Sequence, residues 1–575
     1  MMAELNFRNF RTWDCPFKGK IPDLLKPNRK ICHLKRRKRM QRWNGWGDDL
    51  LHTELPPAAY ELLQEFIGRG NPIKDYPLEK FLRQIPRTRL HDHPLISGDA
   101  KERLTHAHGQ SLPDWIDMRM GTMGQFPDGV AFPANMNQLG EILNFSKKHK
   151  TMLIPFGGGT SVVGHLQVPE SDNPVITLSL RRLRRLIKLD PHNRLATFEA
   201  GIMGPELESL LRAEGFTLGH YPQSFEYSSL GGWVTTRSSG QQSSHYGRIE
   251  KLFAGGEVLT PRGSLHIPPF PASAAGPDLR HMLMGSEGRM GVLSKAVVRI
   301  SPIPEKDDVY GIFFPSWEAA EAAVREIAGT GPHFSMIRLS NPLETATNLA
   351  LAGHEKQIGL LRRYLRMRNI QDKDSCMGLI GFIGSRRLVR IFRGEAFSII
   401  RKHKGVSVGK IMGKAWKKNR FRAPYLRNTL WDMGYAVDTL ETALNWDKVS
   451  PAMQSVEKAI RTGLHSRNEK VHVFSHLSHV YPTGSSIYTT YVFRLADTPE
   501  ETLARWKTIK QAASHAIVES GGTISHQHGV GKDHAPYLEA EKGALGMDSL
   551  QQFFSFFDPE GRMNPGKMFE VRNGK

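Results

Sequence analysis

The sequence predicts an α/β (α+β) fold with more than one domain. Three observations lead to this prediction: the length of 575 residues, an alternation of short apolar strands with amphipathic helices, and glycine clusters beside predicted strands. A chain of this length exceeds what one hydrophobic core accommodates. The apolar content of 39%, with 28 Phe and 10 Trp, is typical of a folded protein.

The N-terminal part of the chain predicts a polar, basic region followed by a β-α-β domain. Before residue 125 the sequence is interrupted by proline, and only residues 58–67 show a helical pattern. Residues 129–133 predict a strand, an apolar stripe from Leu139 to Lys148 predicts a helix, and residues 151–156 predict a second strand. This β-α-β texture ends at the proline-rich segment 301–304, which indicates a domain boundary.

The rest of the chain predicts a second α/β domain and a loop-rich C-terminal segment. Residues 310–314 and 487–493 have strand patterns, and residues 317–328 have a helical pattern. A long helix is expected from about residue 502, before the polar loops 526–532 and 558–566. The predicted units are residues 1–125, 126–305, 306–500 and 501–575.

The net charge of +21 predicts an anionic partner but does not identify it. The basic run at residues 35–39 contributes to this charge, and no nucleic-acid-binding motif accompanies it, so no nucleic-acid partner is expected.

Three cysteines without a CxxC pair favour a reducing compartment. No apolar run is long enough for a membrane span, and no secretion signal is evident. We expect a cytoplasmic protein; peripheral membrane contact and a homodimer stay open.

The segment Gly157-Gly158-Gly159-Thr160-Ser161 follows an apolar strand and indicates a phosphate-binding loop. Glycines allow positive φ and bring backbone N–H groups close to one anion. A Walker A loop is excluded because His165 stands where lysine is required, and Val162 breaks the Rossmann pattern. A tight turn is the alternative. Two further clusters of small and hydroxyl residues, at 224–240 and 285–292, favour a large flat cofactor instead.

Together these segments resemble the FAD-binding domain of the vanillyl-alcohol-oxidase (p-cresol-methylhydroxylase) superfamily. The motifs at residues 42–47, 155–161, 231–237, 285–292 and 526–532 are similar to those of its alkyldihydroxyacetonephosphate synthase branch. The resemblance implies an FAD-binding domain of two α/β subdomains, a second α/β cap domain for substrate, and noncovalent FAD. The flavin contacts that it implies are Pro155, Phe156, Gly157, Gly158, Gly159, Thr160, Ser161, Gln223, Ser224, Phe225, Glu226, Tyr227, Ser228, Ser229, Thr236, Arg237, Ser238, Ser239, Glu287, Gly288, Arg289, Met290, Gly291, Val292 and Leu293.

The resemblance also implies a set of catalytic residues. Tyr488, His526, His528 and Arg338 fall on catalytic positions, and Arg427 falls on the position that binds substrate phosphate. The residues alone leave packing open for Tyr488, a solvated basic helix face for Arg427, and a structural ion pair for Arg338. A catalytic phenol would need its pKa lowered from ~10 by nearby cations, which His526 and His528 could supply.

The branch differs from this chain at one position of the histidine-rich loop. Three adjacent histidines of the family correspond here to His526, Gln527 and His528, so the middle function is altered or dispensable. An H-x-H pair can also chelate a metal, but no metal is expected. The implied reaction exchanges the acyl group of acyl-dihydroxyacetone phosphate, an anionic lipid-like substrate, for a fatty alcohol. The alternative is an FAD-linked dehydrogenase of a 2-hydroxyacid such as D-lactate.

Overall fold

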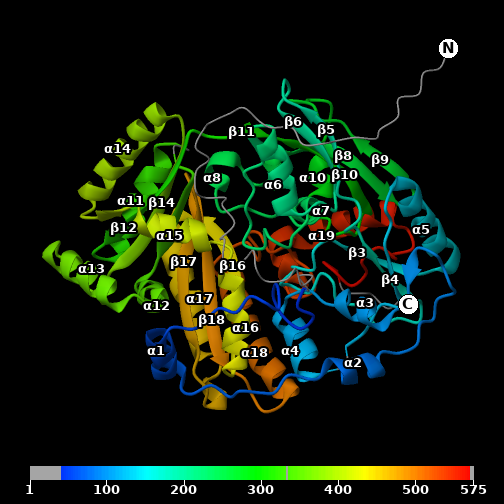
Figure 1. The fold of residues 1–575 in the computed structure, drawn as a ribbon, viewed down its shortest axis with the longest axis horizontal. Helices are drawn as coiled ribbons and strands as arrows, with labels where there is room; N and C mark the ends of the chain where they lie inside the picture. Colours follow the sequence, from blue (N-terminus) through cyan, green and yellow to red (C-terminus); the bar gives the residue numbers. More distant parts are fainter. Residues whose placement is uncertain (1–40, 123, 332–333, 570–575) are drawn as a thin grey trace, which may run out of the picture.

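The computed structural model describes residues 41–122, 124–331 and 334–569. The predicted basic run at residues 35–39 lies outside the described residues, as do Cys15 and Cys32. The described chain forms two halves, each built on its own sheets, which lie side by side in Figure 1. The α/β (α+β) prediction is confirmed, while the predicted unit boundaries stay predictions.

The N-terminal half contains a four-stranded sheet in the order β1-β2-β4-β3 and a five-stranded sheet in the order β5-β6-β10-β8-β9. Two short strands, β11 and β7, form a separate two-stranded sheet. The bounds are β1 Ile96–Ser97, β2 Gly129–Ala131, β3 Met152–Phe156, β4 Val175–Ser179, β5 Leu186–Asp190, β6 Leu195–Glu199, β7 Phe216–Thr217, β8 Phe253–Thr260, β9 Gly263–Ile267, β10 Val292–Arg299 and β11 Ser301–Pro302.

The expectation of a continuous β-α-β texture up to residue 302 is wrong for the larger sheet. Only β2, β4 and β3 are parallel, whereas every pair of the five-stranded sheet is antiparallel. The strands β8 and β9 are joined by only Pro261 and Arg262. Such a short turn connects antiparallel strands, because parallel neighbours need a long crossover.

The helices of the N-terminal half are mostly short. Their bounds are α1 Pro57–Ile67, α2 Leu78–Gln84, α3 Ala100–Thr105, α4 Leu112–Met120, α5 Met136–His149, α6 Gly204–Ala213, α7 Leu230–Thr235, α8 Ser243–Tyr246, α9 Ile249–Leu252 and α10 Leu279–Leu283. The predicted helix at 58–67 corresponds to α1, but α2, α3 and α4 were not expected. They are too short for a periodic stripe, and side-chain caps at Asp99 and Ser111 help to start α3 and α4.

The second half is built on a seven-stranded antiparallel sheet in the order β15-β12-β14-β13-β17-β18-β16. The strands are β12 Lys306–Phe314, β13 Met336–Ser340, β14 Cys376–Gly384, β15 Val406–Gly409, β16 Tyr435–Asn445, β17 His472–Tyr481 and β18 Gly484–Arg494. The helices are α11 Trp317–Gly329, α12 Pro342–Ala352, α13 Glu355–Met367, α14 Arg386–Lys402, α15 Ile411–Asn419, α16 Ala423–Asp432 and α17 Trp446–Thr462. The predicted strands at 310–314 and 487–493 and the helix at 317–328 are confirmed.

Alternation along the central strands separates a packed face from a face that points to the N-terminal half. Ile337, Leu477 and Ile487 lie in one core cluster with residues of α11, α14 and α17. Neighbouring residues such as Arg338 and Tyr488 therefore point to the opposite face, because successive side chains of a strand alternate.

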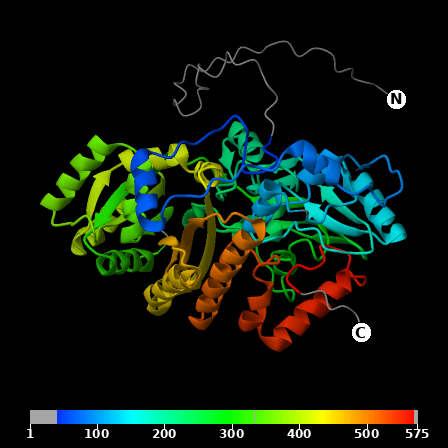
Figure 2. The same ribbon diagram turned by 90° about the horizontal axis from the view of Figure 1, so that it is seen from below.

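Segments distant in sequence hold the two halves together. Helix α1 packs against α12 and β17, and α4 packs against α18 (Pro499–Glu519). Helix α19 (Leu538–Phe557) returns to the core of the N-terminal half, as the red helix in Figure 2 shows. Among the described helices, none has the length and apolarity that crossing a membrane requires.

Candidate active site

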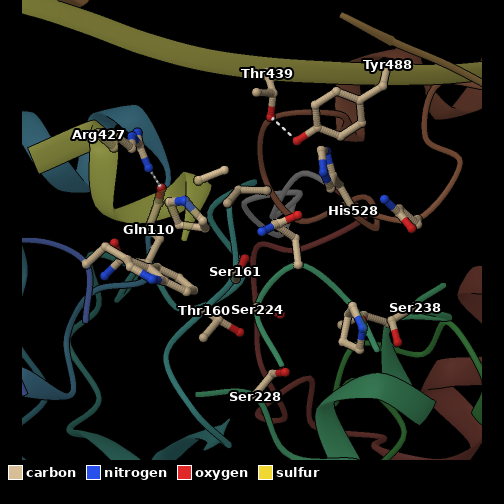
Figure 3. A pocket seen from close by; sticks show the side chains of 18 of the residues that line it. Gln110, Thr160, Ser161, Ser224, Ser228, Ser238, Arg427, Thr439, Tyr488 and His528 are labelled. Carbon is tan, nitrogen blue, oxygen red and sulfur yellow. Dashed lines mark hydrogen bonds between the residues drawn. The ribbon is translucent and has the colours of Figure 1, made fainter. Parts of the chain in front are cut away.

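A cavity of about 550 Å³ lies where the two halves meet. One wall consists of the glycine-rich loop and hydroxyl side chains of the N-terminal half, and the other consists of the seven-stranded sheet. In Figure 3, Thr160, Ser224 and Ser228 lie on the side opposite Arg427 and Tyr488. The sheet contributes alternate residues of adjacent strands: Met336, Arg338, Val437, Thr439, His472, Phe474, His476, Ser478, Tyr488, Thr490 and Val492.

The glycine-rich loop leaves backbone donors free at the cavity. Within the described part of the chain, none of the N–H groups from Gly158 to Ser161 donates a hydrogen bond to the protein. Adjacent unpaired N–H groups are costly unless they face water or an anion, so this loop is suited to a pyrophosphate.

The prediction that these glycines are needed for positive φ is only partly right. Gly159 alone of the three has a positive φ, 69°. At Gly158 a Cβ would lie 1.6 Å from the carbonyl oxygen of Tyr227, so the constraint is the close packing of two loops.

Glu287 connects three of the predicted motifs. Its carboxylate accepts hydrogen bonds from the N–H groups of Val530 (2.6 Å) and Gly531 (2.8 Å). The Nε2 of His165 lies 3.0 Å from Glu287, and His165 Nδ1 lies 2.7 Å from the Ser161 hydroxyl. The glycine-rich loop, the 285–292 segment and the C-terminal loop therefore share one buried carboxylate.

Most of the predicted flavin contacts line the cavity. These are Pro155, Phe156, Gly157, Gly158, Gly159, Thr160, Ser161, Gln223, Ser224, Ser228, Ser229, Thr236, Ser238, Ser239, Glu287, Gly288, Gly291, Val292 and Leu293. The others do not line the cavity. Phe225 and Met290 belong to the core, Tyr227 and Glu226 contact the Tyr425 hydroxyl, Arg237 pairs with Glu250, and the Arg289 guanidinium lies over Phe569.

Tyr488 lies in the sheet wall between two imidazole rings. Its hydroxyl donates to Thr439 (3.1 Å), as Figure 3 shows. Its ring stacks on His476 with the ring centroids 5.1 Å apart, and the ring of His528 lies nearly perpendicular to it with the centroids 5.7 Å apart. The expectation that nearby cations lower its pKa is wrong. Burial raises the pKa of Tyr488 to about 12, and burial lowers the pKa values of His526 and His528, so these rings supply little positive charge. A neutral phenol is a proton donor.

The structure separates the two predicted histidines. His528 lines the cavity, whereas His526 lies behind it, where Nε2 is 2.7 Å from both the Arg248 guanidinium and the Tyr481 hydroxyl. Gln527 lines the cavity between them. Among the described residues, no group of three or more His, Cys, Asp or Glu is arranged to hold a metal ion.

The two predicted arginines have different partners. Arg427, on α16, lies over the Trp115 ring at 4.3 Å and donates through Nη1 to the carbonyl oxygen of Gln110. Its Nε and Nη2 have no hydrogen-bond partner in the described part of the protein, and burial lowers its pKa to about 10, so it stays a cation at neutral pH. Arg338 instead pairs with Glu344 at 2.7 Å while lining the same cavity.

Several residues of the site were not predicted. Glu344, His476, His479 and Glu441 come from strands and a helix that carry no glycine-rich motif. Two signals could have indicated them: histidines at alternate positions of an apolar strand, 472 and 476, and a lone glutamate within the apolar segment 435–445. Buried ionisable residues are rare, so such positions are candidates for a functional site.

Comparisons with known proteins agree with this arrangement. The family described as "FAD binding domain" matches residues 127–267, and "FAD linked oxidases, C-terminal domain" matches residues 303–568. The alkyldihydroxyacetonephosphate synthase of Dictyostelium discoideum is 30% identical over 92% of this chain and 93% of its own length. The chain belongs to the alkyldihydroxyacetonephosphate synthase family. The Trypanosoma brucei brucei synthase is 29% identical over 92% of both chains.

A solved alkyldihydroxyacetonephosphate synthase structure superposes with a TM-score of 0.76 at 25% identity, covering 91% of this chain and 98% of that chain. Membership of this synthase family makes the chain an FAD-dependent enzyme with a lipid-like small-molecule substrate. The unpaired N–H groups of the glycine-rich loop and the hydroxyls beside it fit the cofactor. They would hold its pyrophosphate, and FAD when bound would supply the flavin chemistry of the cavity.

Proposed function

We propose that this enzyme exchanges the acyl group of acyl-dihydroxyacetone phosphate for a fatty alcohol, which forms an alkyl ether. The observation that carries the proposal is Arg427, a cation at the cavity with two nitrogens, Nε and Nη2, that have no partner among the described residues. A guanidinium fork binds phosphate through parallel charge-assisted hydrogen bonds. The net charge of +21 attracts such an anion over longer distances.

An apolar arm of the cavity favours a long-chain substrate over a small hydroxyacid. It is lined by leucines of α1 and α16, by Leu351 of α12 and by Leu55, which precedes α1. These residues are Leu55, Leu62, Leu63, Leu351, Leu426 and Leu430. Burial of a fatty chain against them would stabilise binding by about 0.8 kcal/mol per methylene group.

Tyr488 of the sheet and His528 of the C-terminal loop would manage the protons of the exchange. The incoming alcohol loses its O–H proton, the departing fatty acid takes one, and no electrons are gained or lost overall. Tyr488, neutral because burial raises its pKa to about 12, can donate a proton to a departing oxygen. His528, whose pKa burial lowers, is unprotonated at neutral pH and can accept one.

Turnover with purified enzyme tests this function. Labelled fatty alcohol should enter the product from acyl-dihydroxyacetone phosphate without consumption of an electron acceptor. If exchange is absent while D-lactate or another 2-hydroxyacid bleaches the flavin absorbance, the dehydrogenase function holds and the exchange function fails.

We further propose that FAD is held without a covalent bond. His165, the residue beside the loop that could form such a bond, already has its two ring nitrogens against Ser161 and Glu287. Acid precipitation should release yellow FAD into the supernatant, and a fluorescent protein band after denaturing electrophoresis would contradict the proposal.

Peripheral contact with an anionic membrane is also part of the proposed function. On α13, Leu360 and Met367 are 72% and 70% exposed, and Tyr364 lies between them at helical spacing. The neighbouring Arg363 and Arg366 are exposed as well. Exposed apolar residues flanked by arginine favour an anionic bilayer, which would also supply the fatty substrates.

A further inference from the structure

The proposed proton donor and its two cross-strand neighbours form one row across the sheet. His476 of β17, Tyr488 of β18 and Glu441 of β16 are direct cross-strand neighbours. Directly opposed residues point to the same face of a sheet. Tyr488 therefore lies between His476 and a carboxylate that no motif singled out.

Each histidine beside Tyr488 has a buried carboxylate behind it. Glu344 lies 3.0 Å from His476 Nδ1, and Glu441 Oε1 lies 3.9 Å from His528 Nε2. Both carboxylates are 1% exposed. The two pairs differ in their remaining partners, and this difference decides what each carboxylate can do.

Glu344 is neutralised permanently, because Arg338 also lies 2.7 Å from it. Glu441 has no such cation: within the described residues, no lysine or arginine forms an ion pair with it, and neither of its oxygens has a hydrogen-bond partner. An unneutralised buried carboxylate is costly. The imidazoles that could compensate its charge by taking up a proton are those of His528, His526 and His479. His479 stays neutral at neutral pH, because burial lowers its pKa to about 3.

His526 cannot be the imidazole that takes up this proton. Arg248 Nη1 lies 2.7 Å from His526 Nε2, and a guanidinium only donates, so Nε2 accepts and Nδ1 bears the hydrogen. This Nδ1 lies 3.8 Å from Glu441 Oε2. His526 therefore presents a fixed N–H dipole to one oxygen of Glu441 and leaves the other oxygen for His528.

We propose that Glu441 is a positioning residue, a fixed negative charge that orients His526 and stabilises His528 when that imidazole takes up a proton during turnover. The catalytic part of this role rests on the proposed function, since the proton comes from the fatty alcohol. Charged or titratable groups from other elements also face His528: Lys510 of α18, Asp438 of β16, His526 of the same loop, and the Tyr488 ring.

The proton affinity of His528 tests the proposal without any substrate. Histidine-labelled FAD-loaded enzyme is titrated by NMR, and the His528 signal is assigned by its loss in His528→Asn. Glu441→Gln keeps the shape but removes the charge, so the His528 midpoint should fall by about 1–3 pH units. Glu208→Gln makes the same change at a buried carboxylate outside the cavity and should leave the midpoint unchanged. An unchanged midpoint in Glu441→Gln overturns the proposal.

Turnover separates this role from the proposed function. With flavin content and melting temperature retained, Glu441→Gln should lose about 10²-fold in exchange rate, and the acid limb of its pH profile should move to lower pH. Since Glu441 raises the pKa of His528, its removal must shift that limb downward. If the wild-type enzyme shows no exchange but Glu441→Gln still lowers the His528 midpoint, only the proposed function is refuted. Normal exchange in Glu441→Gln refutes the role of Glu441 alone.

Discussion

Replacement of Arg427 by alanine is the sharpest test of phosphate recognition. The side chain offers Nε and Nη2 without partners among the described residues. Each hydrogen bond to a charged group contributes about 1.5–3 kcal/mol, so two such bonds contribute about 3–6 kcal/mol. At about 1.4 kcal/mol per tenfold change, Arg427→Ala should lower kcat/KM by about 10²–10⁴-fold.

The assay compares two substrates with two variants. On acyl-dihydroxyacetone phosphate the full loss is expected, whereas on the same molecule without its phosphate the wild type and Arg427→Ala should have similar kcat/KM. Arg427→Lys keeps the charge but lacks the planar fork, so it should give an intermediate loss. Flavin content serves as the control, because Arg427 also packs on Trp115. An equal loss on both substrates would refute phosphate recognition and leave Arg427 a packing residue.

Three further changes test other parts of the site. Gly158→Val should abolish FAD binding, because its side chain would meet the Tyr227 carbonyl, whereas Gly140→Ala, with open space around it, should bind FAD normally. Tyr488→Phe should keep FAD and lose at least ~10²-fold in turnover, while Tyr435→Phe, outside the cavity lining, should not. Leu360→Asp should weaken sedimentation with anionic vesicles more than Leu545→Asp on α19; equal binding by both would remove α13 as the membrane contact.

The wall of the cavity that contains the glycine-rich loop could be predicted from the sequence, because the residues that form this loop are adjacent in the chain. A strand followed directly by Gly157-Gly158-Gly159 brings backbone donors together within one short segment. What the sequence could not give is the reason for each glycine. The contact of Gly158 with Tyr227 joins segments 69 positions apart, and only the folded chain brings them so close that a Cβ at Gly158 would lie 1.6 Å from the Tyr227 carbonyl oxygen.

The sheet wall could be predicted only at residues that the family resemblance identified. Tyr488 and Glu441 are neighbours because β18 pairs with β16 in one particular register, and a shift of one residue would turn either side chain to the packed face. Strand patterns predict β18 but not its partner. The pKa expectation for Tyr488 was wrong for a related reason: burial depends on how the two halves meet.

The middle position of the histidine-rich loop can now be interpreted from its neighbours. Gln527 lines the cavity, and its Oε1 has no hydrogen-bond partner in the described part of the protein, but an amide cannot take up a proton at neutral pH. His526 holds its Nε2 against Arg248 and is also unavailable. Any proton acceptor that this loop supplies to the cavity must therefore be His528. On the role proposed for Glu441, proton transfer by His528 in this chain should therefore be faster while that carboxylate remains behind the imidazole.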